Sequence, residues 1–134
     1  MHNAIKTGYT FAWGADVSET GFLRSKPAVC VIPTDEDKEN KILREPGQEK
    51  EITQEMRQEG YDNWETTDDH GMQIFGIAKD QNGKEYFMMK NSWGEYGPYK
   101  GFWYVSKPYV AYKTMNIVIN KNAIPKDIRK KLGI

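Results

Sequence analysis

The chain has 134 residues, of which 38% are hydrophobic, so it can bury one core but is too short for two ordinary domains, and we expect a single domain over residues 1–134. Lys plus Arg and Asp plus Glu both total 19, and this balance gives no argument for a nucleic-acid or membrane-surface protein. A single cysteine excludes an internal disulfide framework and a cysteine metal quartet, and no apolar run approaches the ~20 residues of a membrane span.

The first third of the chain contains two predicted strands. Residues 8–14 read GYTFAWG, an aromatic-rich run between glycines that is typical of a buried strand. Residues 28–33, AVCVIP, form a second apolar run that ends at a proline. Because Cys30 has no helix start beside it to activate the thiol, we expect a buried structural residue. From about residue 34 to residue 51 the sequence is charged, and Pro46-Gly47 indicates a turn in a surface loop.

The middle of the chain predicts a helix followed by a hairpin. Residues 48–62 place apolar side chains on one side and polar ones elsewhere, which indicates a short surface helix. Two apolar runs then flank Asn82-Gly83, a dipeptide that favours a tight turn between antiparallel strands.

The remaining segments complete the predicted fold. We expect strands at residues 101–106 and 114–120, and a C-terminal helix and tail at residues 125–134. The sum is an α+β fold with an antiparallel, partly barrel-like sheet and short helices around it. The large apolar residues of the hairpin are assigned to the core, with no binding role: Met72, Phe75, Phe87, Met88 and Met89.

His70 and Asn91 lie on the two strands of the predicted hairpin. In an antiparallel pair, any loop of even length puts these two positions on the same face of the sheet. With a four-residue loop over residues 80–83, His70 would lie opposite Trp93 and diagonal to Asn91. A neutral amide that accepts the imidazole N–H fixes the tautomer without adding charge, which suits a Cys–His pair. Trp93 would cover this hydrogen bond and exclude water.

The same residues have simpler interpretations. One is that Asn91 caps the end of a strand, and another is that His70 is a structural residue of its strand. A metal site at Asp68, Asp69 and His70 is disfavoured, because consecutive strand residues point to opposite faces of a sheet. A calcium loop in the DQNGK stretch lacks the later acidic ligands, so we predict no metal and no cofactor.

One long stretch, TTDDHGMQIFGIAKDQNGKEYFMMKNSWG, resembles the histidine and asparagine segments of papain-like cysteine peptidases. The flanking stretches WGADVSETGF, YDNWETTDDHGM and KPYVAYKTMNIVINKNAIPK are similar to the carboxy-terminal half of the bleomycin hydrolase and aminopeptidase C branch. The resemblance spans nearly the whole chain, apart from the charged loop near residues 34–51. It implies the right-hand, β domain of the papain-like fold.

The resemblance also implies a role for each matched residue. His70 would be the catalytic base, Asn91 the residue that orients it, and Trp93 the indole that shields their contact. In this family the C-terminal carboxylate extends into the cleft and holds the amine of the substrate, a role that would fall to Ile134. Family members assemble as hexamers around a basic channel, so the resemblance implies a homo-oligomer. It further implies a cytoplasmic protein.

Two parts of papain-like enzymes are missing from the sequence: the nucleophilic cysteine at a helix start, and the glutamine upstream of it. We therefore interpret the chain as the carboxy-terminal part of a thiol aminopeptidase, which would act on peptides only with the cysteine-bearing half and would be inactive alone. An isolated copy should expose apolar surface and self-associate or exchange a segment between copies. The alternative is a naturally short, non-catalytic binding or assembly module. Nucleic-acid binding through the basic segment from Lys107 onward is the least favoured hypothesis.

Overall fold

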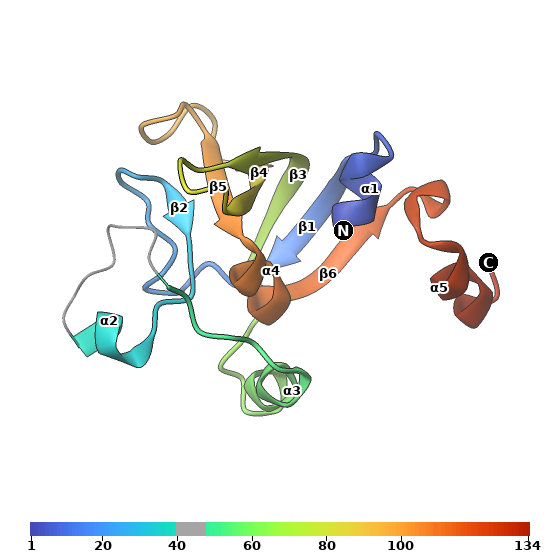
Figure 1. Ribbon diagram of the computed structural model, residues 1–134, viewed down its shortest axis with the longest axis horizontal. Coiled ribbons are helices and arrows are strands. Elements are labelled where there is room, and N and C mark those ends of the chain that lie inside the picture. Colours follow the sequence, from blue (N-terminus) through green and yellow to red (C-terminus); the bar gives the residue numbers. More distant parts are fainter. Residues whose placement is uncertain (40–47) are drawn as a thin grey trace.

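The computed structural model describes residues 1–39 and 48–134 (Figure 1). These residues form short helices and strands. In chain order they are α1 (His2–Lys6), β1 (Phe11–Ala15), β2 (Val29–Cys30), α2 (Asp35–Glu39), α3 (Gln54–Asp62), β3 (His70–Lys79), β4 (Glu85–Lys90), β5 (Phe102–Ser106), α4 (Lys107–Lys113), β6 (Thr114–Ile119), the 3₁₀ helix η1 (Lys121–Ala123) and α5 (Lys126–Leu132).

The described strands form one six-stranded sheet in the order β2-β5-β4-β3-β1-β6. Its two edges, β2 and β6, do not pair, so the sheet is open rather than closed into a barrel. Neighbouring strands are antiparallel except β2 and β5, which run parallel. The α+β fold with short helices is confirmed. The expected antiparallel arrangement holds for every described strand pair except β2 and β5, because no hairpin joins β2 to its neighbour and fixes its direction.

The core lies on one face of the sheet, where every second side chain of a strand points. Phe11 and Trp13 of β1 lie opposite Ile74 and Met72 of β3, and all four are at most 5% exposed. Helix α4 covers this face: its Tyr109 is fully buried and packs edge-on against Trp13, with the ring centroids 6.4 Å apart. The intervening residues of β1 and β3 point to the other face.

The β3–β4 hairpin is present, but its connection is longer than the four residues expected. Lys79 pairs with Glu85, so an odd number of residues, five, separates the paired strand ends. If that register continued unbroken, His70 would face the opposite side of the sheet from Asn91. Instead the register shifts by one residue at Phe75, which forms a β-bulge. The bulge offsets the odd connection and returns His70 and Asn91 to the same face.

Three helices were not anticipated from the sequence: α1, α2 and α4. Helix α2 lies inside the segment predicted to be a charged loop, and the predicted turn at Pro46-Gly47 lies outside the described residues. Helix α4 starts after Ser106, whose Oγ accepts a hydrogen bond from the Tyr109 backbone N–H at 3.2 Å. Helix α3 begins at Gln54, later than residue 48. No described helix has the length and apolar character that crossing a membrane would require.

The chain leaves the sheet at the end farther from His70. Ala15 of β1 pairs with both His70 and Thr114, the first residue of β6. Phe11, at the other end of β1, pairs with Ile119, the last residue of β6. Segments η1 and α5 therefore follow the end of the sheet away from His70, and Figure 1 shows α5 standing apart beyond β6. The assignment of residues 1–134 to a single domain stays a prediction.

Candidate active site

His70 is the first residue of β3 and is half-buried. Two carboxylates fix the backbone that leads into it. Asp16 Oδ2 accepts a hydrogen bond from the Thr67 N–H at 3.0 Å, and Asp69 Oδ1 accepts one from the Val17 N–H at 2.9 Å. The segment before β3 is thus held to the end of β1, which limits where the His70 side chain can lie.

Asp16 is a buried charge that sequence reasoning missed. Burial alone would raise the pKa of this carboxyl, but hydrogen bonds from Ser18 and Thr67, together with the charge of Lys113, outweigh burial and lower the pKa. Lys113 is 1% exposed and pairs with Glu19 at 2.5 Å. The available signal was the DVS triplet, because an aspartate two residues before a serine favours a turn closed by the aspartate side chain.

Asn91 forms a short hydrogen bond with His70, with 2.6 Å between Asn91 Oδ1 and His70 Nε2. The Ser92 backbone N–H donates to the same Asn91 atom at 2.7 Å, which identifies that atom as the oxygen of the amide. Because an amide oxygen only accepts, His70 Nε2 must carry the proton. Nδ1 is then the unprotonated nitrogen of the neutral imidazole. The Ser92 hydroxyl lies 3.3 Å from Nε2 and adds a second polar contact.

A closed loop over residues 91–101 holds Asn91 in place after the end of β4. Asn91 is 3% exposed, and its backbone N–H donates to the Gly101 carbonyl at 2.9 Å. Gly101 has a φ of 91°, and a Cβ there would lie 2.2 Å from the Gly94 carbonyl oxygen. Only glycine fits this approach, so the loop closes through the contact between Gly94 and Gly101.

Trp93 packs against His70 with the two rings tilted, with ring centroids 4.7 Å apart and an angle of 35° between the planes. Behind it lie Phe22 and Trp103, with centroids 5.9 Å and 6.2 Å from that of Trp93. The Arg24 guanidinium lies 5.3 Å from the Trp93 ring centroid. An aromatic cluster thus supports Trp93 and shields one side of the His70 imidazole.

Cys30 is not part of this arrangement. It is fully buried in β2, on a strand separated from β3 by β5 and β4. Burial raises the pKa of its thiol well above the ordinary value, which disfavours the thiolate that a nucleophile requires.

Ile134 is not brought to His70 either. Its backbone N–H donates to the Arg129 carbonyl at 3.1 Å, and its side chain is 62% exposed. It follows α5, at the end of the sheet away from His70, as Figure 1 shows for the C-terminus. Within the described residues, no group of three or more histidine, cysteine or acidic side chains could hold a metal ion.

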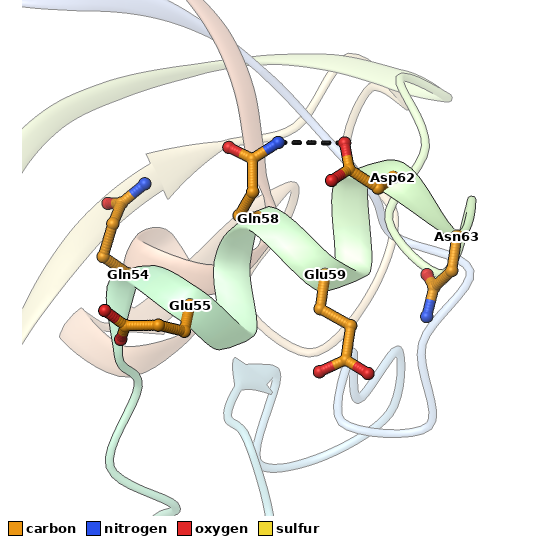
Figure 2. Close-up of a pocket in the computed structure, with 6 residues that line it drawn as sticks. All are labelled: Gln54, Glu55, Gln58, Glu59, Asp62 and Asn63. Atoms are coloured by element: carbon orange, nitrogen blue, oxygen red, sulfur yellow. Dashed lines mark hydrogen bonds between the residues drawn. The ribbon is translucent and has the colours of Figure 1, made fainter.

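A broad hollow of about 650 Å³ lies along α3, away from these residues (Figure 2). Its lining is polar and comes from one short stretch: Gln54, Glu55, Gln58, Glu59, Asp62 and Asn63. Gln58 Nε2 donates to Asp62 Oδ1 at 2.9 Å within it. No second element contributes, so we assign this surface no part in the candidate active site.

Comparison with known proteins places these features in context. A curated relative, aminopeptidase C from Lactobacillus helveticus, is 32% identical over 69 residues, which are 52% of this chain and 15% of the relative. The crystal structure of PepW from Lactobacillus rhamnosis HN001 is similar, with a TM-score of 0.61 and 22% identity. That match covers 97% of this chain and 28% of PepW, and it shows a shared fold. This chain therefore spans a minor part of the length of both proteins.

The family comparison is more specific. The model of the Peptidase C1-like family matches residues 48–133, which include His70, Asn91 and Trp93. This range covers more than half of the chain and runs from just before α3 to the end of α5. The chain therefore belongs to the Peptidase C1-like family.

Proposed function

We propose that this chain supplies the histidine and the asparagine of a cysteine-type aminopeptidase that acts on peptides. The observation that carries the proposal is the 2.6 Å contact between His70 Nε2 and Asn91 Oδ1, with Trp93 packed against the imidazole. Family membership supports peptidase chemistry, and the similarity to aminopeptidase C supports removal of residues from the amino end of a peptide.

The proposed chemistry follows from the tautomer. With Nε2–H held by Asn91, His70 Nδ1 accepts the proton of a cysteine thiol and leaves a thiolate beside an imidazolium. The thiolate attacks the peptide carbonyl carbon, and Nδ1–H protonates the leaving amine as the C–N bond breaks, giving a thioester. Nδ1 then takes a proton from water as its oxygen attacks the thioester, which releases the acid and regenerates the thiol.

A neutral amide behind the histidine fits this role. A carboxylate there would add a negative charge close to the thiolate, whereas Asn91 holds the ring and leaves the ion pair as the only charges. Trp93 and the aromatic residues behind it exclude water from one side of the imidazole, which strengthens the hydrogen bond to Asn91.

The nucleophile in this proposal comes from outside the described residues. Cys30, the only cysteine of the chain, is buried and has a raised thiol pKa, so we expect the chain to be inactive alone. The same observation favours a second candidate function, a non-catalytic binding or assembly module. A homo-oligomeric state and a cytoplasmic location belong to the first proposal and are supported by the family resemblance. That the terminal carboxylate of Ile134 holds the substrate amine stays a prediction; in this structure the Ile134 backbone N–H donates to the Arg129 carbonyl of α5.

The test is to isolate the polypeptide that carries this sequence from its source cells, using an antibody raised against the chain. We expect a mass several times 15.5 kDa, and hydrolysis of leucyl-aminocoumarin that stops after thiol alkylation. A polypeptide of 15.5 kDa without this activity would sink the proposal and support the non-catalytic module.

The two histidines of the chain provide a matched pair of variants for that polypeptide. His70→Ala should abolish hydrolysis, because the thiol loses its base. His2→Ala should retain it, because His2 pairs with Glu85 at 3.2 Å, outside the His70–Asn91–Trp93 arrangement. Equal activity of the two variants would contradict the assignment of His70.

A further inference from the structure

Arg24 is an exposed cation beside the candidate active site, and the proposed chemistry does not use it. Its guanidinium carbon lies 5.3 Å from the centroid of the Trp93 ring, and that centroid lies 4.7 Å from the centroid of the His70 ring. Trp93 is 36% exposed, so part of its indole is open to solvent. Arg24 and the imidazole are therefore neighbours of the same partly exposed indole.

The backbone next to Arg24 is anchored to the aromatic cluster behind Trp93. The Trp103 indole N–H donates a hydrogen bond to the Leu23 carbonyl at 3.0 Å. A Cβ at Gly97, in the loop that carries Trp93, would lie 3.6 Å from the Arg24 carbonyl oxygen, so this loop packs against the turn that carries Arg24. The position of the Arg24 backbone is thus fixed relative to Trp93 and to the imidazole.

The charge of Arg24 is not neutralised by a neighbouring carboxylate. Within residues 1–39 and 48–134, Arg24 forms no ion pair. A guanidinium over an indole is attracted by the ring and keeps its N–H donors for another partner. Those donors form a planar fork that matches the two oxygens of a carboxylate. This position therefore favours a ligand that carries a carboxylate.

The proposed chemistry indicates which part of a peptide would approach Arg24. His70 protonates the leaving amine, so the leaving part of the peptide begins at the imidazole, against which Trp93 packs. The acyl part stays on the sulfur of the nucleophile. The two distances through the Trp93 centroid put the guanidinium within about three residues of extended chain from the imidazole, at ~3.3 Å per residue. A carboxylate on the first residues of the leaving part can therefore reach Arg24.

We propose that Arg24 binds a carboxylate on the leaving part of the peptide and so favours substrates that carry one close to the cleaved bond. This inference rests on the proposed function and adds to it a residue that selects among peptides. The carboxylate has two chemical sources, the C-terminus of a short peptide or an acidic side chain just after the cleaved bond. Both present the same pair of oxygens to the guanidinium.

The test is binding of three small probes to the 15N-labelled 134-residue chain, followed by NMR. Each probe has the free amine of a leaving part: alanyl-alanine ends in a carboxylate, alanyl-glutamic acid α-amide carries its carboxylate on the side chain, and alanyl-alaninamide has none. We expect a carboxylate probe to shift the Arg24 Nε–H and Trp93 indole N–H signals in a saturable way. Alanyl-alaninamide should bind about fivefold more weakly, because the ion pair is lost. The tighter of the two carboxylate probes identifies the source.

Three variants separate a contact with Arg24 from general effects of charge. Arg24→Gln should weaken binding of the tighter carboxylate probe about fivefold, because it removes the charge. Arg24→Lys restores the charge without the planar fork and should recover only part of the affinity. Lys26→Gln removes an exposed charge two residues away and should leave the affinity nearly unchanged, because solvent screens a charge without direct contact. The Trp103 indole N–H, which donates to the Leu23 carbonyl, reports that the turn stays folded in each variant.

Three results would overturn the proposal: equal affinities of the three probes, no saturable shift of the Arg24 and Trp93 signals, or equal affinities of the Arg24→Gln and Lys26→Gln variants. Binding is measured here without turnover, whereas the proposed function is tested by hydrolysis. Failure of carboxylate binding therefore leaves the His70–Asn91 chemistry standing, and failure of that chemistry leaves the binding result in place.

Discussion

The oxygen and the nitrogen of the Asn91 side-chain amide differ in their hydrogen bonds. Oδ1 accepts hydrogen bonds from His70 and from the Ser92 N–H, whereas Nδ2 is buried with no hydrogen-bond partner among the described residues. Leaving a buried donor unsatisfied costs about 1–3 kcal/mol. A residue that only capped a strand would carry this cost for no return. Because the amide nitrogen is left without a partner while the oxygen is bonded, we infer that Asn91 is present for the contact of its oxygen with His70.

Asn91→Ala should allow the His70 imidazole to populate both neutral tautomers. Without the amide oxygen, nothing at this position selects Nε2–H over Nδ1–H, so we expect the imidazole 15N signals to move toward the average of the two neutral tautomers. Ser92→Ala is the comparison, because it keeps the backbone N–H that donates to Asn91 and removes only the longer 3.3 Å hydroxyl contact with Nε2, so it should move the signals less than Asn91→Ala does. Unchanged 15N signals in Asn91→Ala would show that another group orients the ring.

In the loop over residues 91–101, a contact between backbone atoms determines where two side chains lie. It carries Asn91 and Trp93 at its start, and Gly101 closes it by approaching the Gly94 carbonyl. Gly97 also has a positive φ, of 84°, and packs near Trp103 of the aromatic cluster. The positions of Asn91 and Trp93 therefore depend on glycines that lie several residues away from them.

Gly101→Ala should destabilise this loop strongly. The strained φ alone costs of order 1–3 kcal/mol, and the Cβ would also collide with the Gly94 carbonyl oxygen. Gly83→Ala is the matched control, since Gly83 has a similar φ of 81° but nothing within 4 Å of its added Cβ. Urea unfolding of both variants isolates the collision as the difference between them. Equal losses would mean that the loop relaxes around the added methyl group.

The elements differ in how far the sequence determines them. The hairpin can be predicted from the sequence because Asn82-Gly83 marks its turn, and the DDHGM and KNSWG stretches mark the ends that carry His70 and Asn91. The facing of His70 and Asn91 came from an even loop in the prediction, but arises from an odd connection and the bulge at Phe75. The extra residue in the connection and the extra residue at the bulge each shift the register by one, and the two shifts cancel. The alternation of apolar and polar residues therefore does not reveal either of them.

Tertiary contacts account for what the sequence did not predict. Lys113 belongs to the basic segment from Lys107 onward, yet it is 1% exposed and paired with Glu19. Lys107 pairs with Glu85 at 2.6 Å. The basic segment therefore presents less free charge than its composition suggests, which further weakens the nucleic-acid hypothesis. Whether a given lysine is exposed or is buried with a partner depends on contacts between segments far apart in the sequence.

Across the whole molecule, buried charges join three distant segments. Asp16 follows β1, accepts the Thr67 N–H before β3, and is electrostatically coupled to Lys113 at the end of α4. The pKa of Asp16 is lower in the folded chain than its ordinary value of 3.8. Its contribution to stability is therefore complete above about pH 4 and is lost as the pH falls through the lowered folded pKa.

Asp16→Asn should make the stability of the fold depend less steeply on pH in the acid range. At pH 7 we expect the variant to be less stable by about 1–3 kcal/mol, because charge-assisted hydrogen bonds are lost. Between pH 4 and pH 2 the variant should lose less stability than the parent chain, since one titrating group is gone. Thermal unfolding followed by circular dichroism across this range measures both effects. Identical slopes in the two proteins would assign the acid sensitivity to other carboxyls.

The edge strand β6 should promote self-association of the chain. Val118 is 73% exposed and Ile117 37%, on a strand whose outer edge pairs with no other described strand. Val118→Lys should lower the mass-average size measured by light scattering at high concentration, because charge on an edge opposes strand pairing. Val118→Thr keeps strand propensity without charge and should associate more than the lysine variant. A strictly monomeric parent chain would contradict this expectation.

The place of β1 in the sheet sets an order for assembly during synthesis. β1 is made early, but it lies between β3 and β6, and its Trp13 indole donates to Thr114 Oγ1 across 101 residues of sequence. As the chain emerges from the ribosome, β3 and β4 can pair and bring His70 to Asn91 while one edge of β1 stays open. Closing so distant a contact is slow. We therefore expect the His70–Asn91 contact to form before the sheet is complete, while the open edge of β1 is still exposed to chaperones and to neighbouring nascent chains.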